Sequence, residues 1–342
     1  MLSKRTKGLF IEVNGFSYLV AAATGLTPPF SLESIHEFPR NEPAKLKDFL
    51  DQSVSGRRNR YYHSHCGIVP ESRFVRLHNL ESMAKAKDPG YFQELLEQQY
   101  RINGKGSRIA VVNAQSGIDF SPDRPLASQK DLILCGADRR EVNAFQDNLI
   151  ECGIFPQSLQ LGTISSVAGL KHYLQSMDIQ DTVLLLEVTQ NTANLFILSK
   201  DKVDLCRPVN FGFNSVLPVI QQELGLKDEE SAKNLFFSNT FDFREIGAKL
   251  LRKFLKELNA STGFYEVQTG QTIPYLYMTS LPENLNWIPE VVARELDIKL
   301  LDIDWDGWAE KAGISFGESC SSADLKPSTF GLFSLCVNLD EK

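Results

Sequence analysis

The stretch LFIEVNGFSYLVAA (9–22) decides the fold, because a similar pattern returns much later as LLLEVTQNTANLFIL (184–198). Each stretch reads as an apolar strand, a short polar turn and a second apolar strand, which is the pattern of a β-hairpin. In the first copy, Asn14-Gly15 predicts a tight two-residue turn, because both residue types accept positive φ angles. The chain is therefore expected to contain the same hairpin twice.

The segments that follow each hairpin repeat as well. When the copies are aligned, Glu12 matches Glu187, about half of the chain further on. A third strand and then a helix are expected after each hairpin, at 30–38 and 42–53 in the first copy and at 203–209 and 214–226 in the second. A repeat of half the chain length predicts two related α/β lobes, each with the order β-β-β-α.

The remaining segments fill the two halves. Between the copies, strands are expected at 107–114 and 131–138 and helices at 88–104 and 139–154, as in a small α+β insert. After the second copy, a helix (243–262), a strand (273–280), a helix (286–297) and a strand (298–303) are expected. We therefore predict a first lobe at 1–178 with an insert at about 74–155, and a second lobe at 179–342 with a helical subdomain at about 224–268.

Composition narrows the class of protein. The chain has 342 residues, of which 42% are hydrophobic and 23% charged, as in a soluble globular protein. Its net charge of −7 disfavours nucleic acid and anionic membrane as partners. No apolar run approaches the length of about 18 residues that a membrane helix needs. The six cysteines are scattered without a CxxC pair, which predicts reduced, structural thiols in a cytoplasmic protein.

Three further segments carry a family resemblance. In order and spacing, CGIVPESRFVRLHNL (66–80), FQELLEQQY (92–100) and 131–170 resemble PilM, the actin-like protein of type IV pilus assembly and a relative of FtsA. The resemblance runs from about residue 8 to about residue 337 and rests on many weak segments. It implies an α/β actin-like ATPase fold, in which two ribonuclease H-like lobes are duplicated and the first carries a small α+β insert.

Members of this fold that use ATP hold its phosphates between the two hairpin turns, through an aspartate, glycines and small hydroxyl residues. An aspartate can hold magnesium, and glycine lets backbone N–H groups approach the phosphates. In the first hairpin, Glu12 replaces the aspartate and Asn14 a glycine, and the bulky Phe16 stands where small residues are usual. Gly15 and Ser17 keep the expected character.

The other two nucleotide signatures depart in the same way. In the second hairpin, Glu187 replaces the aspartate and Thr189 the glycine, and the glycine pair expected against the purine reads Ser280-Leu281. The resemblance thus implies a degenerate nucleotide cleft, made of Glu12, Asn14, Gly15, Ser17, Glu187, Thr189, Asn191, Thr192 and Ser280. We expect no cofactor, no catalytic residue and no metal, with residual binding of ATP and magnesium left open.

The resemblance implies an interaction protein. In that family, the groove between the first lobe and its insert accepts the cytoplasmic N-terminal tail of a PilN-like inner-membrane protein. We therefore expect a cytoplasmic adaptor of a type IV pilus or related secretion machinery, held at the inner membrane through its partner, with self-association into a ring left open. The alternative is an active ATPase or kinase-like enzyme that uses Glu12 and Glu187 around magnesium.

A third possibility is an FtsA-like role at the division site. That family binds membrane through a C-terminal amphipathic helix, whereas STFGLFSLCVNLDEK (328–342) is short and ends acidic. We therefore expect no direct membrane insertion.

Three other motifs have simpler explanations. HSHC (63–66) offers metal-ligand types, but alternate residues of a strand face opposite sides. Asp302, Asp304 and Asp306 are expected to be solvated charges at a strand end, and GRRNRYY (56–62) a solvated loop.

Overall fold

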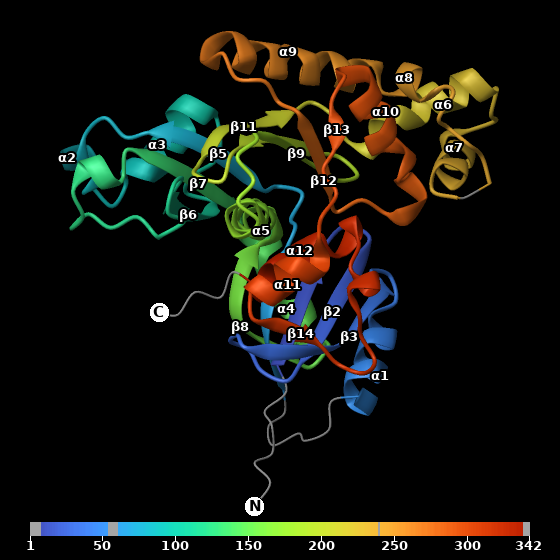
Figure 1. Ribbon diagram of the computed structural model, residues 1–342, viewed down its shortest axis with the longest axis horizontal. Coiled ribbons are helices and arrows are strands. Elements are labelled where there is room, and N and C mark those ends of the chain that lie inside the picture. The colour runs from blue at the N-terminus through green and yellow to red at the C-terminus, as the bar shows by residue number, and fades with distance from the viewer. Residues whose placement is uncertain (1–7, 54–60, 239, 338–342) are drawn as a thin grey trace, which may run out of the picture.

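The computed structural model describes residues 8–53, 61–238 and 240–337, and it places two large lobes one above the other with a smaller unit at the side (Figure 1). Of the motif GRRNRYY, residues 56–60 lie outside the described residues. Within the described ranges, the strands form three sheets, one in each lobe and one in the side unit.

The sheet of the first lobe has the order β14-β3-β2-β1-β4-β8. Its strands are β1 (Gly8–Val13), β2 (Ser17–Ala23), β3 (Phe30–Pro39), β4 (Tyr62–Ile68), β8 (Ile154–Leu161) and β14 (Ile314–Phe316). The first three form an antiparallel meander, and β4 and β8 continue in parallel. Every residue of β1 is buried, because both faces of this sheet are covered.

The sheet of the second lobe repeats this plan with the order β11-β10-β9-β12-β13. Its strands are β9 (Val183–Val188), β10 (Ala193–Leu198), β11 (Val203–Val209), β12 (Tyr275–Thr279) and β13 (Lys299–Leu300). Glu12 and Glu187 are each the last residue but one of the first strand of their lobe. The predicted duplication of the hairpin is therefore confirmed, whereas β13 is shorter than the strand expected at 298–303.

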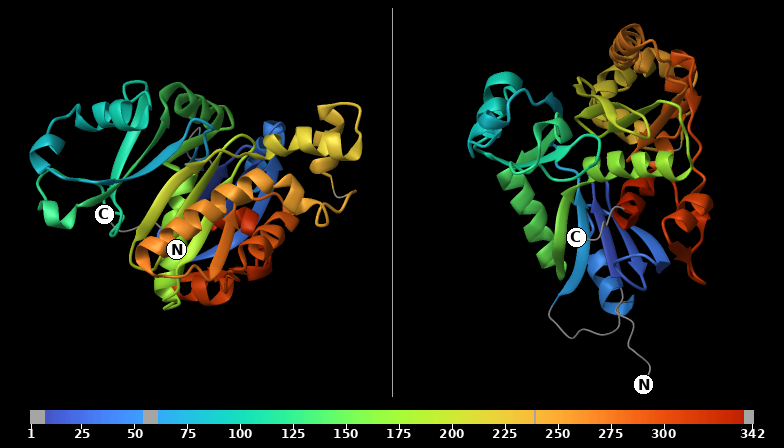
Figure 2. Two further views of the ribbon diagram at one scale, coloured as in Figure 1. Left: turned by 90° about the horizontal axis from the view of Figure 1, so that it is seen from above. Right: turned by 60° about the vertical axis from the view of Figure 1, so that its left-hand side comes forward.

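The insert contains the third sheet, with the order β5-β7-β6 and antiparallel pairing throughout. Its strands are β5 (Phe74–Asn79), β6 (Ser107–Asn113) and β7 (Asp131–Asp138), and its helices are α2 (Met83–Ala86) and α3 (Tyr91–Tyr100). Helix α4 (Arg139–Glu151) follows β7 and leads from the insert back to β8 of the first lobe. The unit extends sideways from the body of the molecule (Figure 2). β5 also lies against β11 of the second lobe.

Helices cover the outer faces of both large sheets. Helix α1 (Pro43–Ser53) and α4 enclose one apolar cluster against the first sheet. The second lobe carries α6 (Leu217–Leu224), α7 (Glu229–Phe236), α8 (Gly247–Leu250), α9 (Arg252–Thr269) and α10 (Trp287–Leu296). The helix expected at 243–262 begins only at Gly247, after a turn at 244–246, and it is divided at Leu251 into α8 and α9, which continues to Thr269.

Two helices lie between the lobes, α5 (Gly162–Ser176) and α12 (Phe330–Val337) (Figure 1). They pack on each other so closely that a Cβ added at Gly169 would lie 2.0 Å from Ser334 Oγ. Both belong to an apolar cluster that also takes side chains from the inner faces of the two large sheets. Burying each large side chain of such a cluster contributes about 1.5–3 kcal/mol.

The C-terminal elements α11 (Trp305–Lys311), β14 and α12 return to the first lobe. Strand β14 pairs with β3, and α12 packs against β1. The sheet of the first lobe therefore draws an edge strand from the range predicted as the second lobe. The physical reason is the apolar surface of α12, buried all round from Phe330 to Cys336, which needs cover on every side.

The first hairpin turn differs from its prediction. Neither Asn14 nor Gly15 has a positive φ angle, so the expected two-residue turn is wrong. The turn instead spans 14–17, between the paired residues Val13 and Tyr18. The Oδ1 atom of Asn14 accepts hydrogen bonds from the backbone N–H groups of Phe16 and Ser17, each at 2.9 Å. An asparagine that binds its own turn in this way replaces the backbone conformation that glycine would supply.

Candidate functional site

The two hairpin turns approach the same place, between the lobes. The ring of Phe16, in the turn of the first hairpin, lies 6.2 Å from the ring of Phe213 and 5.9 Å from that of Phe237, both in the second lobe. Phe16, a residue of the first lobe, therefore connects the two lobes through its contacts with these rings of the second lobe. The polar residues at the ends of β1 and β9 form the candidate site.

At the centre of this site, Arg73 and Glu187 form a buried ion pair. Arg73 lies just before β5, and its Nη2 and Nε atoms donate to Glu187 Oε2 at 2.7 and 2.9 Å. The side chains of both residues are almost fully buried, with exposed fractions of 0% and 1%. A guanidinium group thus binds the carboxylate of Glu187, which the sequence resemblance predicts to lie in a nucleotide cleft.

The other groups around the pair complete its hydrogen bonds. Arg73 Nη1 donates to the carbonyl of Pro70 at 3.1 Å and to Thr192 Oγ1 at 2.9 Å. Thr163 Oγ1 donates to Glu187 Oε1 at 2.7 Å, and Asn194 Nδ2 donates to Glu187 Oε2 at 3.1 Å. Because a buried charge is costly unless its partners satisfy it, this network is what allows the pair to remain buried.

Glu12 is buried without comparable partners. Its exposed fraction is 1%, and neither carboxyl oxygen has a hydrogen-bond partner among the described residues. Burial raises its pKa to about 8, and the nearby Glu187 carboxylate acts in the same direction, whereas the Asn14 side chain opposes them in part. Gly331 leaves room for this carboxyl, since a Cβ there would lie 1.9 Å from Glu12 Oε2. At pH 7 the Glu12 carboxyl is therefore predominantly neutral.

These contacts do not fit a magnesium nucleotide. A divalent cation needs ionised carboxylates or free oxygen ligands, but Glu12 holds a proton and the Glu187 oxygens already accept from Arg73, Thr163 and Asn194. The donors of Arg73 that a phosphate would need are likewise bound to protein acceptors. Of the two glutamates named in the enzyme alternative, Glu187 is thus bound by protein donors, and Glu12 is buried without a hydrogen-bond partner among the described residues.

The other predicted cleft residues mostly bind their own turns. Ser17 donates to the side chain of Asn14, and Thr189 Oγ1 lies 3.0 Å from Thr192 Oγ1. Asn191 Oδ1 accepts from Asn214 Nδ2 at 2.9 Å. A Cβ added at Gly15 would come within 3.9 Å of Glu71, whose carboxylate accepts from Thr189. Their role toward a nucleotide stays a prediction.

Ser280 has an unusual backbone. It follows β12 with a φ angle of 61°, in the left-handed region that favours glycine. This is where the glycine pair is expected. Ser280 therefore adopts a backbone conformation typical of glycine at the position where the resemblance predicts a glycine pair.

Arg73 is the residue that sequence reasoning missed. It lies within CGIVPESRFVRLHNL, where the only sign was a basic residue at the start of an apolar strand. Its partner Glu187 is 114 positions away, so no local pattern connects the two.

The other motifs make structural contacts. His65 Nδ1 lies 2.6 Å from Ser158 Oγ, the ring of His63 lies 5.3 Å from that of Phe155 in a tilted arrangement, and Cys66 is buried. Asp304 caps the start of α11, and Asp306 accepts from Ser322. Among the described residues, no cluster of histidine, cysteine or acidic side chains could hold a metal ion.

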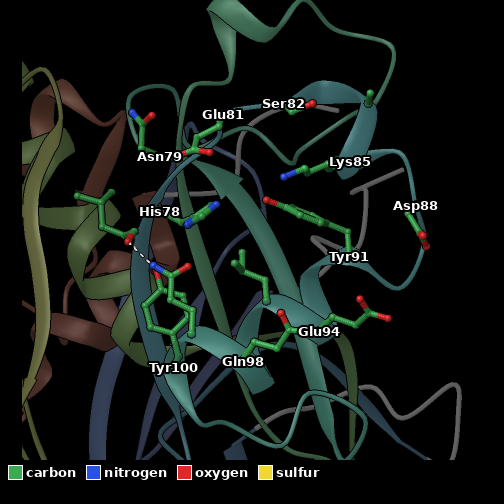
Figure 3. A pocket seen from close by; sticks show the side chains of 14 residues that line it. His78, Asn79, Glu81, Ser82, Lys85, Asp88, Tyr91, Glu94, Gln98 and Tyr100 are labelled. Carbon is green, nitrogen blue, oxygen red and sulfur yellow. Dashed lines mark hydrogen bonds between the residues drawn. The ribbon is translucent and has the colours of Figure 1, made fainter.

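A separate pocket opens in the insert, with a volume of about 750 Å³ (Figure 3). It lies along the second half of β5 and is closed by α2 and α3. His78, Lys85 and Tyr91 point toward one another across its middle (Figure 3), and the hydroxyl of Tyr100 donates to the carbonyl of Leu77 at 3.2 Å. This pocket lies within the insert, whereas the groove expected from the resemblance lies between the insert and the first lobe.

Acidic groups outnumber basic ones in this pocket. Its lining includes the carboxylates of Glu81, Asp88 and Glu94 beside the ammonium group of Lys85. Burial lowers the pKa of His78, which the Glu81 carboxylate opposes in part, so the histidine adds little positive charge near neutral pH. The pocket therefore favours a ligand that carries positive charge.

Comparison with known proteins shows what the whole chain is similar to. No protein-family model matches it, and no curated protein matches it by sequence. The chain superposes on a solved PilM–PilN type IV pilus biogenesis complex with a TM-score of 0.68 and 16% identity, over 97% of this chain and 98% of the other.

Two further solved structures are similar at lower scores. The ethanolamine utilization protein EutJ from Carboxydothermus hydrogenoformans matches with a TM-score of 0.46 and 8% identity, over 98% of this chain and 91% of that one. A Bacteroides thetaiotaomicron protein with an actin-like ATPase fold and unknown function matches with a TM-score of 0.41 and 9% identity, over 87% and 91%. At these scores the two likenesses support no further conclusion.

The expected fold is confirmed. The chain has the actin-like ATPase fold, with duplicated lobes and an α+β insert in the first of them. The resemblance to PilM is found again in three dimensions, at the level of the fold. No helix in the described ranges is long and apolar enough to cross a bilayer.

Proposed function

We propose that this protein is a cytoplasmic scaffold of a type IV pilus or related secretion machinery, held at the inner membrane by the N-terminal tail of a PilN-like protein. The observation that carries the proposal is the likeness to the PilM–PilN structure over nearly the full length of both chains. The pocket in the insert supplies a place where such a tail would bind.

The edge of β5 suits an extended peptide. β5 pairs with β7 on one side and lies at the edge of its sheet. The carbonyls of Val75 and Leu77 face away from β7, since they accept from Cys206 and from the Tyr100 hydroxyl. Such an edge binds a peptide by adding it as a further strand, while pockets along the edge select its side chains. β11 covers the first half of β5, so the tail would bind along Leu77–Asn79.

The negative charge of the pocket determines which kind of tail we expect it to bind. Cytoplasmic segments next to a membrane helix carry an excess of lysine and arginine. The carboxylates of Glu81, Asp88 and Glu94 in the pocket are complementary to such a segment. The partner we propose is therefore a basic tail that binds in an extended conformation.

Catalysis of ATP hydrolysis forms no part of this function. Arg73 and Glu187 bind each other in the cleft, and Glu12 is protonated at neutral pH. Peptide binding at the insert needs no nucleotide, so a cleft closed by its own side chains is compatible with a scaffold. The enzyme alternative would require Glu187 to leave Arg73 before it could hold magnesium.

Fluorescence anisotropy with labelled N-terminal peptides of the single-pass inner-membrane proteins of the same machinery tests the partner. We expect one basic peptide to bind, and Glu94→Lys to weaken it by about tenfold, because this substitution reverses a charge in the pocket. Glu97→Lys is the matched control, an exposed glutamate of the same helix outside the pocket. Failure of every tail to bind, or equal effects of both substitutions, would contradict the proposal.

Calorimetric titration with ATP and magnesium tests the cleft. The unmodified protein should release no binding heat at millimolar ligand. Tight binding that disappears with Glu187→Ala would favour the enzyme alternative instead.

A further inference from the structure

The lobes are connected differently on the two sides of the molecule. On one side, α5 and α12 pack into both lobes as part of one apolar cluster. Among the described residues, the contacts at the hairpin turns are made by individual side chains. They include the ring of Phe16 against Phe213 and Phe237, the hydrogen bonds of Arg73 to Glu187 and Thr192, and those of Thr163 to Glu187 and of Thr189 to Glu71. The side that contains α5 and α12 resembles a hinge, and the side with the hairpin turns resembles the edge at which the two lobes close.

Arg73 binds groups from three segments that meet at this edge, besides its own loop. Its three nitrogens contact Glu187 at the end of β9, Thr192 in the turn of the second hairpin and Thr163 at the start of α5, in addition to Pro70 of its own loop. A planar guanidinium group with several fixed donors suits such a junction, because one side chain can bridge several acceptors at once.

We propose that Arg73 is a built-in lock that holds the two lobes closed. Its guanidinium joins Glu187 and Thr192 of the second lobe to Thr163 and the Pro70 carbonyl of the first lobe. Because every group of this bridge belongs to the chain itself, the closed position does not depend on a ligand.

The lock also positions the insert. Arg73 is followed directly by Phe74, the first residue of β5. Further along, the Cys206 thiol of β11 donates to the carbonyl of Val75 at 3.4 Å. The start of the insert is thus held against the second lobe by the ion pair and by the Val75–Cys206 contact. Loss of the Arg73 contacts would release both the edge between the lobes and the start of β5.

The distance between two spin labels measures whether the lobes are locked. Ala44, on α1, and Asn234, on α7, are exposed, and all six native cysteines are buried, so labels on A44C and N234C report on the two lobes. We expect a narrow distance distribution in the otherwise unmodified protein. Arg73→Met should broaden it and shift it to longer distances, and added guanidinium ion at low concentration should restore it.

Two more variants keep the test decisive. R73M leaves Glu187 buried and unpaired, so it can fail to fold. The double substitution R73M/E187L removes both charges, and Arg73→Lys keeps the charge but loses the planar fork. Each should fold and show the broadened distribution. Arg76→Met is the matched control, because Arg76 is a half-buried arginine of the same segment that donates to Val75 rather than into the cleft.

The outcomes are distinct. A wild-type distribution in the double variant and in R73K would overturn the proposal and leave the ion pair as local packing. A broadened distribution in R76M equal to that in R73K would overturn it as well. Because these readings use no peptide and no nucleotide, they stand apart from the tests of the proposed function.

Discussion

Arg73 and Glu187, 114 positions apart, meet in a buried ion pair at 2.7 Å where the two hairpins of the fold come together. The glutamate that the sequence resemblance assigns to the nucleotide cleft is thus bound to an arginine of the same chain. This ion pair is the main structural observation about the function of the cleft.

Breaking the pair from one side should be costly. Arg73→Met leaves the Glu187 carboxylate buried without its partner, which should lower the free energy of unfolding by about 3–5 kcal/mol. Urea denaturation measures this loss. R73M/E187L should recover most of it, since well-packed apolar residues replace a buried pair at little cost. If the double variant is as unstable as the single one, the charge is not the cause.

Stability should depend on the protonation of Glu12. Its pKa rises from 4.5 to about 8 on folding, so the folded state binds the extra proton between these values. The free energy of unfolding should therefore fall as pH rises from about 5 to 8, by up to about 1.4 kcal/mol per pH unit, and then level off. Glu12→Gln should remove this decline, measured by urea denaturation across the range.

The comparison with E12Q isolates this residue. Burial lowers the pKa of His36, His65 and His78, which makes stability rise with pH near 6 and partly masks the effect. Subtracting the two pH profiles cancels the histidines. Identical slopes for both proteins would show that Glu12 does not titrate in this window.

Ser280→Gly should stabilise the protein. The φ angle of 61° at Ser280 costs a non-glycine residue about 1–3 kcal/mol. Glycine avoids this cost, but its greater conformational freedom in the unfolded chain offsets part of the gain. We expect a net gain of about 1 kcal/mol, seen as a higher Tm. Ser280→Ala keeps the strained backbone and should show no gain. A loss in S280G would mean that the serine side chain matters more than the backbone.

Gly169→Ala should destabilise, against the usual preference of helices for alanine. Helix propensity alone predicts a gain of about 1 kcal/mol, but the new Cβ would lie 2.0 Å from Ser334 Oγ on the neighbouring helix. Overpacking of this kind costs about 1–3 kcal/mol. The double substitution G169A/S334G, which exchanges the small and the larger residue, should recover part of the loss in thermal unfolding.

Much of the fold could be predicted from local patterns. The strands Gly8–Val13, Val203–Val209 and Asp131–Asp138 lie where apolar runs between turn residues placed them. The duplication was visible because Glu12 and Glu187 sit at equivalent places in similar runs. Such features depend on neighbours in the sequence, which a pattern can read.

The turn and the site depend on contacts that no pattern contains. Asn14-Gly15 is typical of a two-residue turn, but the Asn14 side chain binds Phe16 and Ser17 and imposes another shape. The departures from the nucleotide signatures could be read from residue types, whereas Arg73, the residue that binds Glu187, comes from a distant loop. Likewise, the apolar sequence of α12 predicts that this helix is buried, but only the tertiary structure shows which lobe covers it.

The return of α12 to the first lobe has a consequence for folding during synthesis. Phe10 and Leu19, near the start of the chain, share an apolar cluster with Phe333 and Leu335, near the end of the described residues. When the ribosome has released only the first half, these early strands have exposed apolar surface that nothing yet covers, and pairings so distant in sequence form slowly. Although the two lobes repeat one plan, the first lobe is therefore expected to complete its apolar core only after α12 has been synthesised.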